Sequence, residues 1–255
     1  AYCWKMGTTS GIATDDGEGS YDITPGAYSF NATAKQSVIR WDGNSQQDST
    51  LPHGLGVAPN FLMCKCREHF PGRGWAIYHH KNTSAPATDY LAIDKNVATA
   101  DDAAYWYDKN PTATNIFLGN GNDTNATDLF VIYAFAEVQG YSKFGSYTGN
   151  GSNDGPFIYT GFKPAFVMTK MTSSTSEWVM KTAKVYDPPM NINEKYLYAN
   201  IAQAEVDSTG FAFFDFLSNG FKWRNSDAAV NADGGSYVYM AWAESPFVNS
   251  NGIPT

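Results

Sequence analysis

The sequence predicts an all-β chain: two tandem β-sandwich repeats of jelly-roll-like architecture, preceded by the last strand of a further repeat. Three observations support this class: an internal duplication, a composition rich in strand and turn residues, and short apolar runs separated by turn signals. Gly (23), Tyr (16) and Phe (16) are abundant among the 255 residues. Short strands joined by tight turns are typical of β-sandwiches and jelly rolls.

The duplication is clearest in the closing strand of each repeat. Residues 237–244 (YVYMAWAE) match residues 130–137 (FVIYAFAE) at a constant offset of 107 residues. Residues 1–5 (AYCWK) fit the later part of this pattern, with Trp4 at the position of Trp242. A fixed period indicates tandem copies of one domain. We therefore expect the chain to be part of a longer modular protein, or its first strand to pair with a neighbour.

Two further pairs of segments extend the duplication. Residues 56–65 (GVAPNFLMCK) reappear as 161–170 (GFKPAFVMTK), and 41–44 (WDGN) parallel 147–150 (YTGN). The proline in each longer segment suits the start of a strand, because proline cannot donate to a ladder. The predicted organisation is a closing strand (1–6), a connector (7–36), repeat A (37–143), repeat B (144–248) and a C-terminal tail (249–255).

The remaining elements are predicted from apolar runs and turn residues. Residues 119–123 (GNGND) and 231–235 (NADGG) are expected to turn the chain into each closing strand, because Asn and Gly tolerate positive φ. Short helical turns are expected at 101–107 and 202–206. Further strands are predicted at 61–65, 75–78, 90–93, 115–118, 166–170, 178–181, 210–214 and 220–223.

Charge and cysteine usage exclude several classes of partner. The net charge is −8 and only 16% of residues are charged. Phosphate backbones are bound by clustered Lys and Arg, and no such cluster is present, so we expect no nucleic-acid partner. No run of 18 apolar residues is present, so no membrane insertion is expected. Cys3, Cys64 and Cys66 form no disulfide framework, which indicates a reducing compartment.

Three runs carry a resemblance to a known family: 141–151 (YSKFGSYTGNG), 154–164 (DGPFIYTGFKP) and 215–222 (DFLSNGFK). They are similar to a tandem-repeat domain of unknown function found in marine bacteriophage and prophage virion proteins, often tail-fibre-like or structural. The resemblance covers nearly the whole chain. It implies a virion protein that is assembled in the host cytoplasm and exposed on the particle surface. It supplies no activity, ligand or catalytic residue.

Histidines and carboxylates do not form a convincing catalytic or metal-binding pattern. His69, His79 and His80 lie within twelve residues, but neighbouring residues of a strand point to opposite faces. Glu137 and Glu244 end the two closing strands and are expected to hold a loop or a neighbouring unit. A glycosidase would need its two carboxylates within roughly 5–10 Å of each other. No nucleophile elbow or phosphate loop is present, so the chain is not expected to be an enzyme.

Two acid-rich loops, 15–19 (DDGEG) and 122–125 (NDTN), contain the oxygen ligands that Ca²⁺ prefers. Neither loop has the spaced pattern of a calcium-binding loop. We therefore expect turns there, and no metal or other cofactor.

One stretch has the residue types of a carbohydrate site. Tyr105, Trp106, Tyr107 and Asp108 place flat aromatic rings beside a carboxylate in a polar region. Sugar rings stack on aromatic faces, and their hydroxyls bond to acids and amides. The alternative is that one or two of these rings close an end of the sandwich.

The sequence thus predicts a non-enzymatic phage virion module, such as part of a tail fibre or appendage, that adheres to host or environmental glycans. Its expected partners are surface polysaccharide and other virion proteins, with self-association as a homo-oligomer. Tandem repetition suits adhesion because weak sites in a row increase avidity. The competing hypothesis is a capsid or tail decoration module that binds only other virion proteins.

Overall fold

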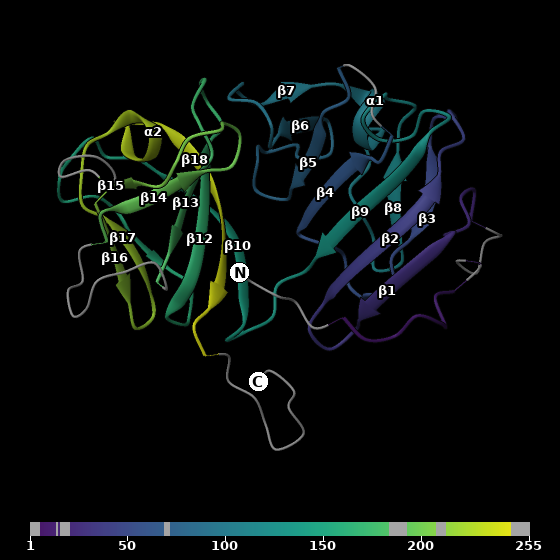
Figure 1. The fold of residues 1–255 in the computed structure, drawn as a ribbon, viewed down its shortest axis with the longest axis horizontal. Coiled ribbons are helices and arrows are strands. Elements are labelled where there is room, and N and C mark those ends of the chain that lie inside the picture. The colour runs from purple at the N-terminus through teal and green to yellow at the C-terminus, as the bar shows by residue number, and fades with distance from the viewer. Residues whose placement is uncertain are drawn as a thin grey trace. The chain divides into compact units, whose positions relative to one another are not determined.

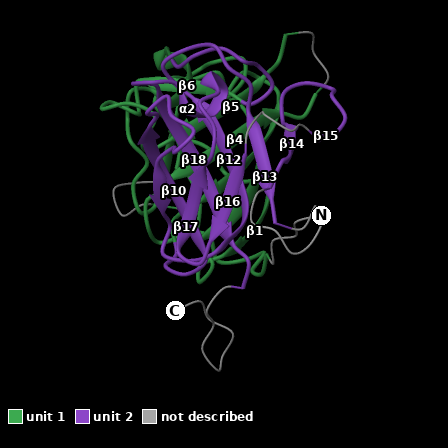
Figure 2. Cartoon of the chain, turned by 90° about the vertical axis from the view of Figure 1, so that its left-hand side faces the viewer, with its two compact units in different colours: residues 1–92, 100–137 green, residues 93–99, 138–255 purple. Residues whose placement is uncertain are grey.

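The computed structural model describes residues 6–13, 15, 21–68, 72–183, 193–207 and 213–245. Within these ranges the chain is nearly all β, which confirms the predicted class, with two four-residue helices, α1 (Ala103–Trp106) and α2 (Ala228–Asn231). The chain divides into two compact units (Figures 1 and 2). Unit 1 runs to Ala92 and resumes from Ala100 to Glu137, and unit 2 contains Ile93–Thr99 and continues from Val138.

Unit 1 is a sandwich of two unequal antiparallel layers. Its larger sheet has the strand order β1-β2-β9-β4-β5-β6-β7, and its smaller sheet pairs β3 with β8. The larger-sheet strands are β1 (Ala27–Asn31), β2 (Gln36–Asp42), β4 (Phe61–Cys66), β5 (Trp75–His79), β6 (Asp89–Ala92), β7 (Ala100–Asp101) and β9 (Leu129–Phe135). The smaller-sheet strands are β3 (Ser49–Pro52) and β8 (Asn115–Leu118).

The core of unit 1 lies between these layers. The larger sheet contributes alternate residues of its central strands, as expected from the two-residue period of a strand. The smaller sheet closes the core from the other side, and α1 adds Trp106. The buried residues include Ile39, Trp41, Leu51, Leu62, Cys64, Ile116, Leu118, Phe130 and Ile132. A core shared by two facing sheets is the defining feature of a sandwich.

Unit 2 repeats this two-layer plan. Its larger sheet has the order β10-β18-β12-β13-β14-β15, and its smaller sheet has the order β11-β17-β16. The larger-sheet strands are β10 (Ser142–Thr148), β12 (Pro164–Met171), β13 (Val179–Thr182), β14 (Lys195–Tyr198), β15 (Val206–Asp207) and β18 (Ser236–Ala243). The smaller-sheet strands are β11 (Phe157–Tyr159), β16 (Phe214–Leu217) and β17 (Gly220–Trp223). The core between them includes Ile158, Val167, Val179, Phe214, Phe221, Trp223, Tyr239 and Ala241.

Each unit fixes the loop after its β2 or β10 strand with a reciprocal pair of asparagines, here called the asparagine clamp. In unit 1, Asn125 Nδ2 donates to Asn44 Oδ1 at 2.7 Å, and the Asn44 backbone N–H donates to Asn125 Oδ1 at 3.2 Å. In unit 2, Asn231 and Asn150 make the same two bonds at 3.0 and 2.8 Å. Both pairs are 81 residues apart. Segments that match in sequence therefore make the same tertiary contacts.

The central strands lie where the sequence predicts them. Several short elements differ from their predicted secondary structure. The expected helical turn at 101–107 contains α1. The helical turn expected at 202–206 is wrong, because Val206 starts β15 and pairs with Tyr196, and tertiary pairing overrides local helix propensity. Ala27–Asn31, which the sequence placed in the connector, form β1 and pair with β2.

Some predictions concern residues beyond the described ranges. These are residues 1–5 of the closing strand of a preceding repeat, the whole C-terminal tail at 249–255, and part of the strand expected at 210–214. Within the described ranges, no helix has the length and apolar composition needed to cross a membrane.

Candidate functional site

The predicted carbohydrate site at 105–108 does not expose its tryptophan. Trp106 is 1% exposed and belongs to the core of unit 1, where its indole meets the Tyr78 ring edge to face at 6.0 Å. Helix α1 directs it there, since Asp102 caps the helix by accepting from the Ala104 N–H at 2.9 Å. The prediction that Trp106 binds a ligand is therefore wrong. The alternative, a ring that closes the sandwich, describes its position.

Tyr105 is occupied by contacts within the protein. Its ring stacks on Tyr90 with centroids 3.6 Å apart, and its hydroxyl donates to Asp123 Oδ2 at 3.1 Å. Burial raises the pKa of Tyr105 well above its ordinary value. The Tyr105 hydroxyl and one face of its ring thus already contact other residues of unit 1.

Tyr107 and Asp108 form a tight turn that leads into Lys109, whose ammonium lies over Phe117 of the smaller sheet. Tyr107 and Asp108 have positive φ, 50° and 52°. The next residue, Lys109, places its ammonium 2.6 Å from both carboxylate oxygens of Asp48 and 5.3 Å from the ring centroids of Tyr107 and Phe117. Phe117 is the aromatic residue on the outer side of β8, between the core residues Ile116 and Leu118. The Lys109 side chain therefore covers the Phe117 ring on this face.

In the described part of unit 2, the corresponding face has exposed aromatic rings. On β11, Ile158 points into the core, whereas its neighbours Phe157 and Tyr159 are 48% and 64% exposed. Successive residues of a strand alternate between faces, so these two rings lie on the same outer side. Among the described residues, Phe157 and Tyr159 are the only aromatic residues that are exposed.

The strand register defines the rest of this surface, here called the aromatic face. Phe157 pairs with Lys222, which pairs with Asp215, and Tyr159 pairs with Gly220, which pairs with Leu217. Gly220 lets the Phe157 ring lie close to the sheet. A Cβ at this position would be 2.1 Å from the Ile158 carbonyl oxygen and 2.9 Å from the Phe157 ring.

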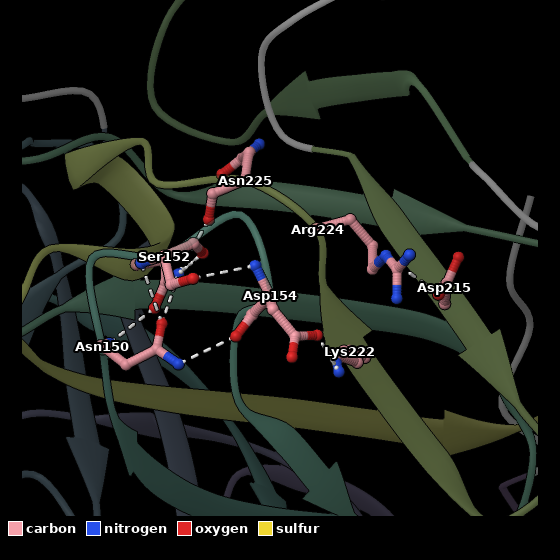
Figure 3. A network of polar contacts seen from close by, with 8 residues as sticks. Asn150, Ser152, Asp154, Asp215, Lys222, Arg224 and Asn225 are labelled. Atoms are coloured by element: carbon pink, nitrogen blue, oxygen red, sulfur yellow. Dashed lines mark hydrogen bonds and ion pairs between the residues drawn. The ribbon is translucent and has the colours of Figure 1, made fainter.

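Charged residues border the aromatic face in two pairs (Figure 3). Lys222 Nζ lies 2.5 Å from Asp154 Oδ1, and this contact lowers the pKa of the Asp154 carboxyl. Arg224 Nε lies 3.6 Å from Asp215 Oδ2, and burial raises the pKa of the Asp215 carboxyl. The surface thus combines two exposed rings with ionic groups that can bond to hydroxyls.

The loop that carries Asp154 is held by the asparagine clamp. Asn150 Nδ2 donates to the Asp154 carbonyl at 3.0 Å, and the Asp154 N–H donates to Ser152 Oγ at 3.1 Å. Asn231 Nδ2 donates to the Ser152 carbonyl at 2.8 Å and to the Asn225 carbonyl at 2.8 Å. Such supporting contacts keep a binding surface in one geometry.

The histidines do not converge on a metal site within the described residues. His79 Nδ1 accepts from the Lys81 N–H at 3.1 Å, His80 Nδ1 lies 3.1 Å from Asn60 Nδ2, and His80 Nε2 is 3.9 Å from Glu137 Oε1. His69 lies outside the described residues. In that part of the chain which the structure describes, no group of three or more His, Cys, Asp or Glu side chains is arranged to hold a metal ion.

The other carboxylates singled out in the sequence have local partners. Glu244 lies 2.8 Å from Lys163 Nζ at the end of β18, and Glu137 lies beside His80. In the loop at 122–125, Asp123 Oδ1 accepts from the Gly74 N–H at 2.6 Å and its Oδ2 accepts from Tyr105. Protein donors thus occupy both carboxylate oxygens of Asp123. Of residues 15–19, only Asp15 is described.

The sequence patterns did not single out the candidate surface formed by Phe157, Tyr159, Lys222 and Arg224. The available signal was the alternation in Phe157-Ile158-Tyr159: an aliphatic residue that points into the core places both aromatic neighbours on the opposite face.

Residues 1–246 match the family model of a domain of unknown function, DUF7483. The match extends over both units. No curated protein and no solved structure matches the chain.

Proposed function

The chain belongs to the DUF7483 family of domains of unknown function, and we propose that it is a non-enzymatic phage virion module that adheres to host or environmental glycans. The binding surface in this proposal is the aromatic face of unit 2. The observation that carries it is the exposed pair Phe157 and Tyr159 on the outer side of β11.

The aromatic face has the features that sugar recognition requires. Its two rings are two residues apart on one strand, which separates them by about 7 Å. An exposed apolar surface bordered by polar groups marks an interaction site. The C–H side of a sugar ring stacks on an aromatic face, and the neighbouring carboxylates and cations bond to its hydroxyls. Asp154 and Lys222 lie at the edge of the rings and supply such groups.

Unit 1 supports this assignment by contrast. Its equivalent face holds Phe117 beneath the Lys109 side chain. A covered ring cannot stack on a ligand, so adhesion is assigned to unit 2. The virion location rests on the resemblance of the sequence runs to phage structural repeats, and repetition along a fibre would increase avidity.

The test is a polysaccharide-binding screen with matched variants. The wild-type chain is compared with the double variant Phe157→Ala/Tyr159→Ala by affinity electrophoresis through gels that contain host or environmental polysaccharides. Val97 and Ile201 are exposed at 40% and 41% but lie outside the smaller sheet, so Val97→Ala/Ile201→Ala is the control. We expect retardation of the wild type and the control, and its loss in the double variant.

The competing hypothesis, a decoration module, predicts a different outcome. Such a module would bind capsid or tail proteins and no polysaccharide. Immunogold labelling of intact particles separates the two: gold at tail tips or long fibres agrees with adhesion, and even coverage of the head contradicts it.

A further inference from the structure

Arg224 offers an open guanidinium at the border of the aromatic face. Its side chain is 42% exposed, and its contact within the described residues is the 3.6 Å approach of Nε to Asp215. Its two terminal nitrogens make no hydrogen bond to described residues. By comparison, Arg73 uses a terminal nitrogen to hold Asp128 at 2.5 Å and is largely buried.

Arg224 shares the outer side of the sheet with the aromatic rings. It follows Lys222 by two residues, and its N–H donates to the Phe213 carbonyl at 2.8 Å, so the pairing with the β16 side continues past Trp223. Residues two apart on a strand point the same way and are about 7 Å apart. The guanidinium thus borders the same surface as Phe157, which lies opposite Lys222.

Lys222 is less available than Arg224 for an anionic ligand. Its side chain is 22% exposed, and its ammonium is paired with Asp154 at 2.5 Å. The Asp154 side chain is itself 81% exposed, so its second oxygen can accept a hydroxyl from a ligand. The face therefore presents two ring surfaces, the exposed Asp154 carboxylate and the Arg224 guanidinium. The Asp215 carboxylate beside Arg224 is only 12% exposed.

We propose that the aromatic face binds a polyuronate, that is, a polysaccharide whose sugar rings carry carboxylates. A sugar ring stacks on Phe157 and Tyr159, its carboxylate is held by Arg224, and a hydroxyl bonds to Asp154. A planar guanidinium binds a carboxylate through two parallel hydrogen bonds, a geometry that a lysine ammonium lacks. This inference rests on the proposed adhesive function and specifies the chemistry of its ligand.

The experiment compares two forms of one polymer. Binding of the intact chain to polygalacturonate and to its fully methyl-esterified form is measured by isothermal titration calorimetry. The two polymers share the sugar ring and differ in the charge of the carboxyl group. Polyglutamate serves as a polyanion without sugar rings. The variants are Arg224→Gln, Arg224→Lys and, as an exposed arginine in unit 1, Arg67→Gln.

We expect polygalacturonate to bind more tightly than its ester, and polyglutamate to bind weakly. Arg224→Gln should weaken polygalacturonate binding by at least about tenfold, the loss expected for a charge-assisted hydrogen bond. Arg224→Lys should recover only part of it, and Arg67→Gln should bind like the wild type.

Other results overturn the inference in distinguishable ways. The polyuronate proposal is refuted if both polymer forms bind equally, or if Arg224→Gln binds polygalacturonate as tightly as the wild type does. If Phe157→Ala/Tyr159→Ala still abolishes binding in that case, the proposed adhesive function stands. Equal binding of polyglutamate shows plain charge attraction and also refutes the polyuronate proposal. If no polysaccharide binds in a way that depends on Phe157 and Tyr159, the proposed function fails together with the inference.

Discussion

The smaller sheets of the two units bury equivalent residues on their inner sides, but their outer sides differ in how far the aromatic residues are exposed. Leu51 and Ile158 occupy equivalent core positions, each paired with a buried residue of the neighbouring strand. On the outer side, unit 1 covers Phe117 with the Lys109 side chain, whereas unit 2 exposes Phe157. The comparison shows that the two units share their packing while their outer surfaces differ, as expected when binding residues lie on a stable scaffold.

In unit 1, the turn that leads into Lys109 directly follows the buried Trp106. Trp106→Ala should lower the free energy of unfolding by about 3–5 kcal/mol, because it removes a large buried ring and leaves a cavity. Urea denaturation followed by circular dichroism measures this loss. Tyr107→Ala, one residue further and only half-buried, is the control and should have a much smaller effect. Equal losses in the two variants would contradict the distinction between a buried Trp106 and a half-buried Tyr107.

Acid should weaken unit 1 through His53, which is fully buried and neutral. Its Nε2 donates to the Thr112 carbonyl at 3.1 Å and its Nδ1 accepts from the Leu55 N–H at 3.2 Å. Burial lowers the pKa of His53 from 6.5 to about 4. Since the unfolded chain binds the proton more readily, stability should be complete above about pH 6.5. It should fall by about 3 kcal/mol as the pH drops to about 4.

Unit 2 provides the matched control for this effect. Thr160 takes the place of His53, and its Oγ1 accepts from the Phe162 N–H at 3.4 Å. His53→Thr should therefore lower stability at neutral pH and reduce its slope between about pH 4 and 6.5. Denaturation curves across this range test the point, and an unchanged slope would show that other groups cause the acid sensitivity.

The two asparagine clamps should respond alike if the units share one plan. Asn125→Ala and Asn231→Ala should each lower the free energy of unfolding by about 1–3 kcal/mol, because each removes buried hydrogen bonds. Chemical denaturation of both variants measures the pair of losses. A large loss in one unit and none in the other would argue against equivalent roles.

The smallest stability effect is expected at the aromatic face. Phe157→Ala and Tyr159→Ala should each change the free energy of unfolding by no more than about 0.5 kcal/mol, because exposed side chains contribute little to the core. Thermal unfolding measures this change. A loss of several kcal/mol would show that the rings are structural, and any loss of glycan binding in the variants would then have another cause.

The central strands could be predicted from the sequence because they carry strong apolar patterns and occur twice. The two-residue strands β7 and β15 escaped prediction because two residues carry too little pattern, and β1 lies in a segment that was predicted to be a connector. The candidate ligand-binding ring Trp106 proved to be buried for a different reason. Trp106 and Phe157 both lie near turn-rich segments, and only the tertiary pairing decides which ring is buried. Ile158, whose core position exposes both neighbours, was the one usable clue.

The most direct test compares both outer faces in one experiment. Hydroxyl-radical footprinting of the wild-type chain, with and without polygalacturonate, reports the solvent access of each aromatic ring. We expect the polymer to protect Phe157 and Tyr159 and to leave Tyr107 and Phe117 unchanged. Protection of Tyr107 and Phe117, with none at Phe157 and Tyr159, would contradict this expectation.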